Sequence, residues 1–121
     1  MVHPTALDCL VVAPDGKSFA AAGADKLVHV FDTATLAERQ SFRAHDGPIT
    51  ALAWHPTRPI LATGSDDLTI KLWNLETGRR LDTLRGPTGT PRVLNFSPSG
   101  QRLACASTDR TVRIWEPASL R

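Results

Sequence analysis

The sequence contains only two cysteines, Cys9 and Cys105, among 121 residues, and they form no C-x-x-C pair. Two isolated cysteines argue against both a disulfide framework and a zinc site. No apolar run approaches the roughly 18 residues of a transmembrane helix, and the start of the chain lacks the basic region and apolar stretch of a signal peptide. We therefore expect a cytoplasmic protein without metal, cofactor or membrane contact.

Helical periodicity and basic clusters are also missing. No segment of roughly ten or more residues repeats its apolar positions with the helical period, so the sequence predicts no substantial helix. The net charge is only +2, and Arg79 and Arg80 are the only adjacent basic pair. Nucleic-acid-binding domains usually carry a basic cluster on one element, so no nucleic-acid partner is expected.

What the sequence does contain is one pattern written three times without gaps, at residues 12–32, 54–74 and 96–116. Equivalent residues are 42 positions apart, as shown by Pro14, Pro56 and Pro98, by Asp25, Asp67 and Asp109, and by Phe31, Trp73 and Trp115. A fixed period of this length indicates a repeat architecture, in which one unit cannot bury its apolar face alone.

Each unit contains short runs of β-branched or alternating apolar residues between turn residues, which is typical of strands. The predicted strands are 7–12, 18–21, 27–31 and 38–42 in the first unit, 49–54, 60–63, 69–73 and 80–84 in the second, and 92–96, 102–105 and 111–115 in the third. The chain ends where a fourth strand of the third unit would begin. The sequence therefore predicts an all-β protein with eleven strands.

Two segments carry a specific motif. Residues 64–74 read GSDDLTIKLWN and residues 107–116 read STDRTVRIWE, while Ala44-His45 precedes the first of them. This pattern resembles the WD-repeat (WD40) family of β-propellers, in which Gly-His and Trp-Asp pairs mark each blade. The resemblance implies a single domain at 1–121 with three four-stranded antiparallel blades, near 3–44, 45–86 and 87–121. The last blade lacks its outer strand.

The resemblance also implies a buried hydrogen-bond chain in each blade, which in the second unit consists of Trp73, Thr63, His45 and Asp67. An indole N–H only donates, a hydroxyl and an imidazole do both, and a carboxylate only accepts, so the four groups match chemically. The first unit has His3 and Asp25 but Ala21 and Phe31 at the other two positions. The third has Asp109 and Trp115 but Pro87 and Cys105. We expect a complete chain only in the middle blade, and more reliance on apolar packing in the outer two.

His45 and Asp67 could also be interpreted as a general base with its orienting carboxylate. No Ser or Cys nucleophile occupies a matching position, and the repeat explains both residues structurally. His29 and His55 align with residues that cannot bind metal, so they predict no metal site. We expect no catalytic residue.

In the WD-repeat family, partner proteins bind where the loops gather around the central channel. The resemblance implies nine contact positions there: Ala6, Asp8, Ala24, Pro48, Thr50, Asp66, Thr90, Arg92 and Thr108. Of these we expect Asp8, Thr50, Asp66 and Arg92 to contact a partner. None is aromatic, and only Arg92 is a residue type that dominates interface hot spots. The sequence predicts either weak, charge-steered recognition at this rim or a solvated surface, with Asp66 facing solvent.

We interpret the chain first as a non-catalytic interaction module or scaffold that completes its propeller with copies of itself, as a dimer or a trimer. Another protein or a peptide is the second expected partner. One alternative is a fragment or engineered piece of a larger propeller without independent activity. A ligand-binding or enzymatic propeller is less favoured because the rim offers so few titratable groups. The edge strand at 111–115 should be exposed unless Met1-Val2 of a neighbour or the tail 117–121 covers it.

Overall fold

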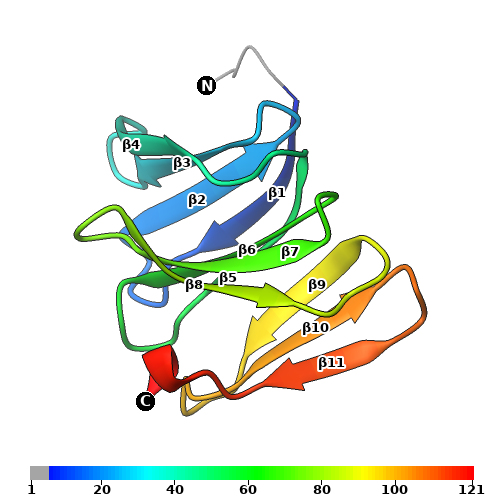
Figure 1. Ribbon diagram of the computed structural model, residues 1–121. Helices are drawn as coiled ribbons and strands as arrows, with labels where there is room; N and C mark the ends of the chain where they lie inside the picture. The colour runs from blue at the N-terminus through cyan, green and yellow to red at the C-terminus, as the bar shows by residue number, and fades with distance from the viewer. Residues whose placement is uncertain (1–5) are drawn as a thin grey trace.

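The computed structural model describes residues 6–121, which form three antiparallel β-sheets stacked side by side (Figure 1). The first sheet contains β1 (Leu7–Val12), β2 (Ser18–Gly23), β3 (Leu27–Asp32) and β4 (Glu38–Arg43). The second contains β5 (Ile49–Trp54), β6 (Ile60–Ser65), β7 (Thr69–Asn74) and β8 (Arg79–Arg85). The third contains only β9 (Pro91–Phe96), β10 (Leu103–Ser107) and β11 (Val112–Trp115). The predicted all-β fold, with eleven strands and a third blade that lacks its outer strand, is confirmed.

The bounds of β1 and β5 are the predicted ones, and those of the other strands differ by one or two residues. The main reason is that the second strand of each blade continues two residues further into the turn that follows it. The tail after β11 forms a single 3₁₀ turn, Ala118–Leu120, and adds no strand to the third sheet. Leu120 is buried among apolar residues of the second and third sheets. The tail therefore helps to join two blades and leaves the edge of β11 uncovered (Figure 1).

The turn between the second and third strands is built identically in all three blades. Lys26, Leu68 and Arg110 occupy equivalent positions and all have left-handed backbone, with φ of 68°, 69° and 69°. The preceding Asp side chain accepts a hydrogen bond from the backbone N–H two residues further on, at 2.9–3.1 Å in each blade. An Asx-type bond of this kind stabilises a turn locally, which explains why Asp recurs there.

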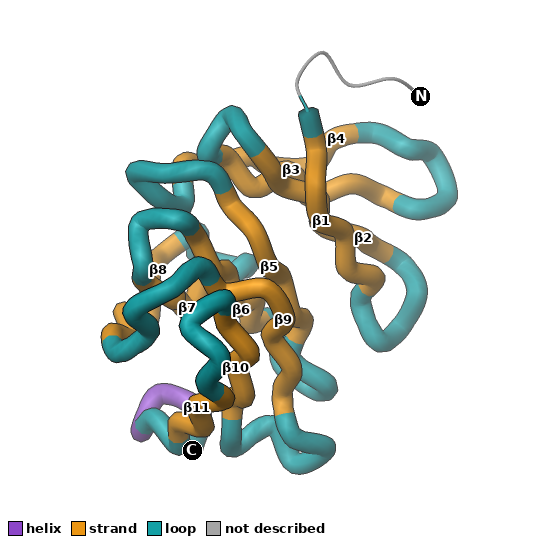
Figure 2. Tube along the Cα trace, turned by 90° about the vertical axis from the view of Figure 1, so that its right-hand side faces the viewer, coloured by secondary structure: helices purple, strands orange, loops and turns teal. Residues whose placement is uncertain are grey.

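Two apolar clusters hold the three sheets together. The cluster between the first and second blades includes Val28, Val30, Leu61 and Trp73, and the cluster between the second and third includes Ile70, Leu72, Leu94 and Leu103. The middle blade therefore packs on both of its faces, and its second strand is buried at all six positions. The inner strands β1, β5 and β9 lie next to one another (Figure 2).

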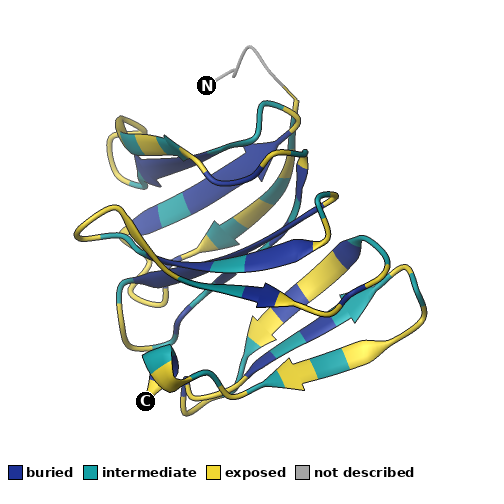
Figure 3. Cartoon of the chain, in the orientation of Figure 1, coloured by how far each residue is buried: buried dark blue, intermediate teal, exposed yellow. Residues whose placement is uncertain are grey.

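The two outer blades each leave one face without a neighbouring blade (Figure 3). On the first blade, Leu10 and Val12 are 62% and 52% exposed. On the third blade, Val93, Val112 and Ile114 are 52%, 70% and 67% exposed. These are large apolar side chains in regular strands, so the stack presents an apolar face at each end.

Candidate functional site

The structure brings His45, Thr63, Asp67 and Trp73 together in one hydrogen-bond chain in the middle blade. The Trp73 indole N–H donates to Thr63 Oγ1 at 3.0 Å, and Thr63 Oγ1 lies 2.7 Å from His45 Nε2. His45 Nδ1 lies 2.9 Å from Asp67 Oδ2, so the imidazole donates at one nitrogen and accepts at the other. His45 and Thr63 are buried, and the carboxylate end of the chain is partly exposed.

This arrangement favours the neutral form of His45. Burial lowers the pKa of His45 despite the hydrogen bond and charge of Asp67, and the Lys71 charge lowers it further. Burial alone would raise the pKa of Asp67, but hydrogen bonds from Thr69 and His45 outweigh it and lower that pKa. A neutral imidazole can accept the Thr63 hydroxyl, so the direction of every hydrogen bond in the chain is fixed.

The first blade contains a different histidine cluster, which the sequence did not indicate. His29, on β3, places Nε2 2.8 Å from Asp25 Oδ2 and Nδ1 2.5 Å from Glu38 Oε1. Burial alone would lower the pKa of His29, but the hydrogen bonds and charges of both carboxylates outweigh it and raise that pKa. The expectation that this blade relies on apolar packing was therefore incomplete. The predicted contribution of His3 lies outside the described residues.

The third blade keeps the turn Asp and loses the buried chain. Asp109 accepts hydrogen bonds from the hydroxyls of Ser107 and Thr111 and from the backbone N–H of Thr88. These bonds, led by those from Thr111 and Ser107, hold the pKa of Asp109 well below its usual range. Cys105, at the Thr63 position, is buried and is a free thiol.

His55 has a structural role that its repeat counterparts do not share. Its Nδ1 accepts hydrogen bonds from the backbone N–H groups of Thr57 and Arg58 at 3.2 and 3.0 Å, and its Nε2–H donates to the Gly100 carbonyl at 2.9 Å. A Cβ at Gly100 would lie 2.3 Å from the imidazole ring, so only glycine fits against it. Burial, with a smaller effect of Arg58, lowers the pKa of His55. The bond joins the second and third blades across 45 residues of sequence, which no local pattern could reveal.

Three of the four predicted rim residues converge on one hollow. Asp8, Thr50 and Arg92 lie on β1, β5 and β9, and all three line a cavity of about 360 Å³ beside the inner strands. Asp8 and Arg92 are exposed. The Thr50 hydroxyl donates to the Pro91 carbonyl at 2.5 Å, so its proton ties the second blade to the third. The two side chains that remain available for a ligand carry opposite charges.

Asp66 does not line this hollow. It is exposed, and its Oδ1 accepts a hydrogen bond from the Thr90 hydroxyl at 2.8 Å. Its carboxylate therefore links the middle blade to the segment that leads into β9. The sequence predicted that Asp66 faces solvent, and it did not predict this contact with Thr90.

Cys9, like Cys105, is a free cysteine. Burial and the Asp8 charge raise the pKa of the Cys9 thiol to about 11, so it stays protonated at neutral pH. Within 6–121, no group of three or more His, Cys, Asp or Glu side chains is arranged to hold a metal ion. No helix in that part of the chain has the length and hydropathy needed to span a membrane.

Comparison with known families agrees with this geometry. The pattern of the family described as WD domain, G-beta repeat matches residues 2–32, 37–74 and 78–116, which together cover most of the chain. The chain belongs to the WD40 family. Each matched segment contains one of the three copies of the repeated pattern, and WD40 proteins typically serve in protein–protein interaction.

Several relatives are similar in sequence to parts of this chain. Human DmX-like protein 1 is 35% identical over 81 residues, which are 67% of the chain and 3% of that protein. WD repeat-containing protein 1 of Mus musculus is 32% identical over 84 residues, or 67% of the chain and 14% of that protein. The nuclear distribution protein PAC1 of Coccidioides posadasii is 46% identical over 48 residues, or 40% of the chain and 10% of that protein. The WD40 chain thus spans only a small part of the curated relatives that it matches.

The fold has a close structural counterpart. The solved structure of U3-55K superimposes on 99% of the chain with a TM-score of 0.91 and 22% sequence identity. The match occupies 38% of that solved chain. At this identity the likeness establishes the propeller blade fold, and the solved chain continues well beyond the matched part.

Proposed function

We propose that the chain is a non-catalytic WD40 interaction module whose two open blade faces pack on further blades, supplied by a second copy of itself. One observation carries the proposal. Ile70 and Leu72 on β7 are completely buried against the third blade, while Val112 and Ile114, 42 residues later, are 70% and 67% exposed. The same face is thus covered in the middle blade and bare in the third.

The opposite end of the stack offers the complementary face. Leu10 and Val12 on β1 are equivalent to Leu52 and Trp54, which pack against the cluster between the first two blades. A third blade that meets the first blade of another copy would repeat the contacts found twice within one chain. Head-to-tail contacts of this kind close into a ring when the rotation permits. Two copies supply six blades, within the usual range of about 4–8, and three supply nine.

A specific observation favours a second candidate. The chain matches 38% of the solved chain and 3–14% of its relatives. In this reading the missing blades belong to the same polypeptide, and the chain alone has no independent activity. In both readings the open faces pack on WD40 blades. The cytoplasmic location expected from the sequence stays a prediction.

For an outside partner, we propose the hollow between Asp8 and Arg92 as the binding surface. The negative charge of Asp8 and the positive charge of Arg92 suit a polar peptide and provide charge steering. Cys9 also lines the hollow, but burial and the Asp8 charge raise the pKa of its thiol to about 11, so the thiolate is scarce at neutral pH. This favours recognition over catalysis.

The mass in solution tests self-completion, that is, whether two copies of the chain pack together to complete one propeller. Sedimentation equilibrium at micromolar concentration should give twice the mass of one chain, which is 13.1 kDa. Ile114→Glu should reduce the mass to that of one chain, because it places a charge in the apolar contact. Leu36→Glu is the matched control, since Leu36 is 47% exposed in the turn between β3 and β4. A wild-type monomer that melts cooperatively at the same concentration would show that self-completion is wrong.

A further inference from the structure

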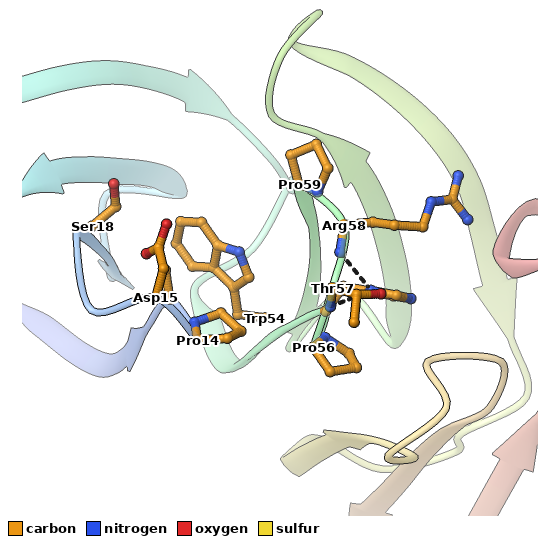
Figure 4. A pocket seen from close by; sticks show the side chains of 10 residues that line it. Pro14, Asp15, Ser18, Trp54, Pro56, Thr57, Arg58 and Pro59 are labelled. Carbon is orange, nitrogen blue, oxygen red and sulfur yellow. Dashed lines mark hydrogen bonds between the residues drawn. The ribbon is translucent and has the colours of Figure 1, made fainter.

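A second hollow, of about 230 Å³, lies between the first two blades at the ends of β1 and β5 (Figure 4). It is lined by the turns that follow these strands, and its wall residues are Ala13, Pro14, Asp15, Ser18, Trp54, His55, Pro56, Thr57, Arg58 and Pro59. The registers of β1 with β2 and of β5 with β6 place these turns at the sheet ends opposite the turns that contain Asp25 and Asp67. It is therefore a different surface from the rim where partners are expected.

The chemistry of this hollow comes from an indole beside a carboxylate. In Figure 4 the Trp54 ring lies between the two turns, with the Asp15 carboxylate next to it. Asp15 Oδ1 accepts the backbone N–H of Lys17 at 2.9 Å, and Oδ2 has no hydrogen-bond partner among the described residues. An aromatic face attracts a cation within about 6 Å of its centroid. The Trp54 ring and the Asp15 carboxylate oxygen thus both attract a positively charged ligand group.

Two arginines lie near this hollow. Arg39 Nη1 donates to the hydroxyl of the wall residue Ser18 at 3.0 Å, and its Nη2 pairs with Asp32 rather than with Asp15. The Arg58 side chain extends away from Trp54 (Figure 4), and its Nη1 donates to the Ser119 carbonyl at 3.4 Å. Lys17 is not among the residues that line the hollow.

Size and rigidity indicate the type of ligand. Small-molecule sites usually measure about 300–1,000 Å³, so 230 Å³ is small for a free ligand and suits one side chain. Pro14, Pro56 and Pro59 form part of the walls, and their fixed φ angles reduce the entropy lost on binding. Because both turns belong to one chain, the hollow is complete whether or not the ring closes.

We propose that this hollow binds a single arginine or lysine side chain from a partner protein, with the cation over the Trp54 ring and hydrogen-bonded to Asp15 Oδ2. Arginine fits best because its planar guanidinium stacks on an indole while it donates to a carboxylate. The inference shares with the proposed function only the assumption of a protein partner, since it does not depend on self-completion.

Nuclear magnetic resonance with short peptides tests the assignment. The probe is capped Gly-Arg-Gly at millimolar concentration, and the readout is the Trp54 indole N–H signal, assigned with Trp54→Phe. The arginine peptide should shift this signal saturably, and capped Gly-Gln-Gly should not. Asp15→Asn keeps the Oδ1 acceptor for Lys17 and removes the charge, so binding should weaken about two- to fivefold, as expected for an exposed ion pair.

Asp46→Asn is the matched control because the Asp46 side chain is 89% exposed and lies outside the hollow. It should leave the affinity unchanged. Equal shifts with the glutamine peptide, or equal affinities of wild type and Asp15→Asn, would overturn the proposal. Repeating the titration with Ile114→Glu separates it from ring closure: binding that persists in that variant supports the hollow whatever the mass measurement shows, and binding lost there contradicts it.

Discussion

The first and middle blades each place a histidine against the Asp of the equivalent turn, yet His45 favours the neutral form and His29 the protonated form. The Asp contact is nearly identical, at 2.8 Å for His29 and Asp25 and 2.9 Å for His45 and Asp67. The two histidines differ in the partner of their other imidazole nitrogen. In the middle blade it faces the Thr63 hydroxyl, and in the first blade it faces the Glu38 carboxylate.

The comparison shows how one backbone framework sets two protonation states. A hydroxyl can donate to a neutral imidazole, so burial dominates and the pKa of His45 falls. Two carboxylates can only accept, so a doubly protonated imidazole satisfies both and the pKa of His29 rises. In both blades the turn Asp accepts a hydrogen bond from one imidazole nitrogen. The partner of the other imidazole nitrogen decides whether the ring is neutral or protonated.

The largest expected effect comes from removing the shared turn Asp in the middle blade. Asp67→Ala removes the carboxylate that accepts from the buried His45 Nδ1–H and from the Thr69 hydroxyl. His45 Nδ1 then keeps only the longer contact to Thr69 Oγ1, at 3.2 Å. It should lower the free energy of unfolding by about 1–3 kcal/mol, measured by urea denaturation. Asp66→Ala is the neighbouring control and should change it by about 0.5 kcal/mol, because the bond to Thr90 is exposed. Equal losses in the two variants would contradict the network argument.

The opposite protonation states predict a stability maximum near pH 6.5, the ordinary histidine pKa. The pKa of His29 is raised in the folded state, so its contribution is complete below pH 6.5 and is lost as the pH rises through the folded value. The pKa values of His45 and His55 are lowered, so the unfolded state binds protons first and stability falls as the pH drops below 6.5. Each proton contributes a slope of at most about 1.4 kcal/mol per pH unit.

Two variants separate the limbs of this pH profile, which is measured by urea denaturation between about pH 5 and 8, where histidines titrate. Glu38→Gln removes one carboxylate from His29 and should flatten the alkaline limb. His55→Asn keeps an oxygen that can accept the amides of its turn, removes one titrating group, and should reduce the slope of the acid limb. An alkaline limb that is unchanged in Glu38→Gln would show that Glu38 does not hold the His29 proton.

The smallest expected effect comes from transferring the middle-blade pattern to the third blade. Pro87→His and Cys105→Thr together restore a histidine and a hydroxyl beside Asp109 and Trp115. Neither change completes the chain alone, so the double variant should gain about 1 kcal/mol beyond the sum of the single variants. A thermodynamic cycle measured by denaturation gives this coupling. A coupling of zero would mean that Pro87 is not equivalent to His45 in space.

Much of this molecule follows from its sequence because the information is local and repeated. A spacing of 42 residues, alternating apolar runs and turn prolines give the strands and their number. In the turn between the second and third strands of each blade, the Asp side chain accepts a hydrogen bond from the backbone N–H two residues further on, so its place is also fixed locally. The motif likewise names His45, Thr63, Asp67 and Trp73, which the structure places in one chain.

Contacts between segments far apart in sequence were decided only by the tertiary structure. The bond from His55 to Gly100 depends on which side chains the packed sheets bring face to face. His29 and Glu38 lie on neighbouring strands of one sheet, only nine residues apart, and the register of β3 with β4 decides their contact. Leu120 shows the same, since it belongs to a tail without a strand pattern and yet its side chain is buried between two blades. The Asp15–Trp54 hollow exists only because two blades stack with their turns side by side. The repeat determines the strands and turns of each blade. The charge state of a histidine depends on which partners the folded blade places beside it, and the binding surfaces arise where neighbouring blades meet, because side chains from both blades set burial and the available hydrogen-bond partners there.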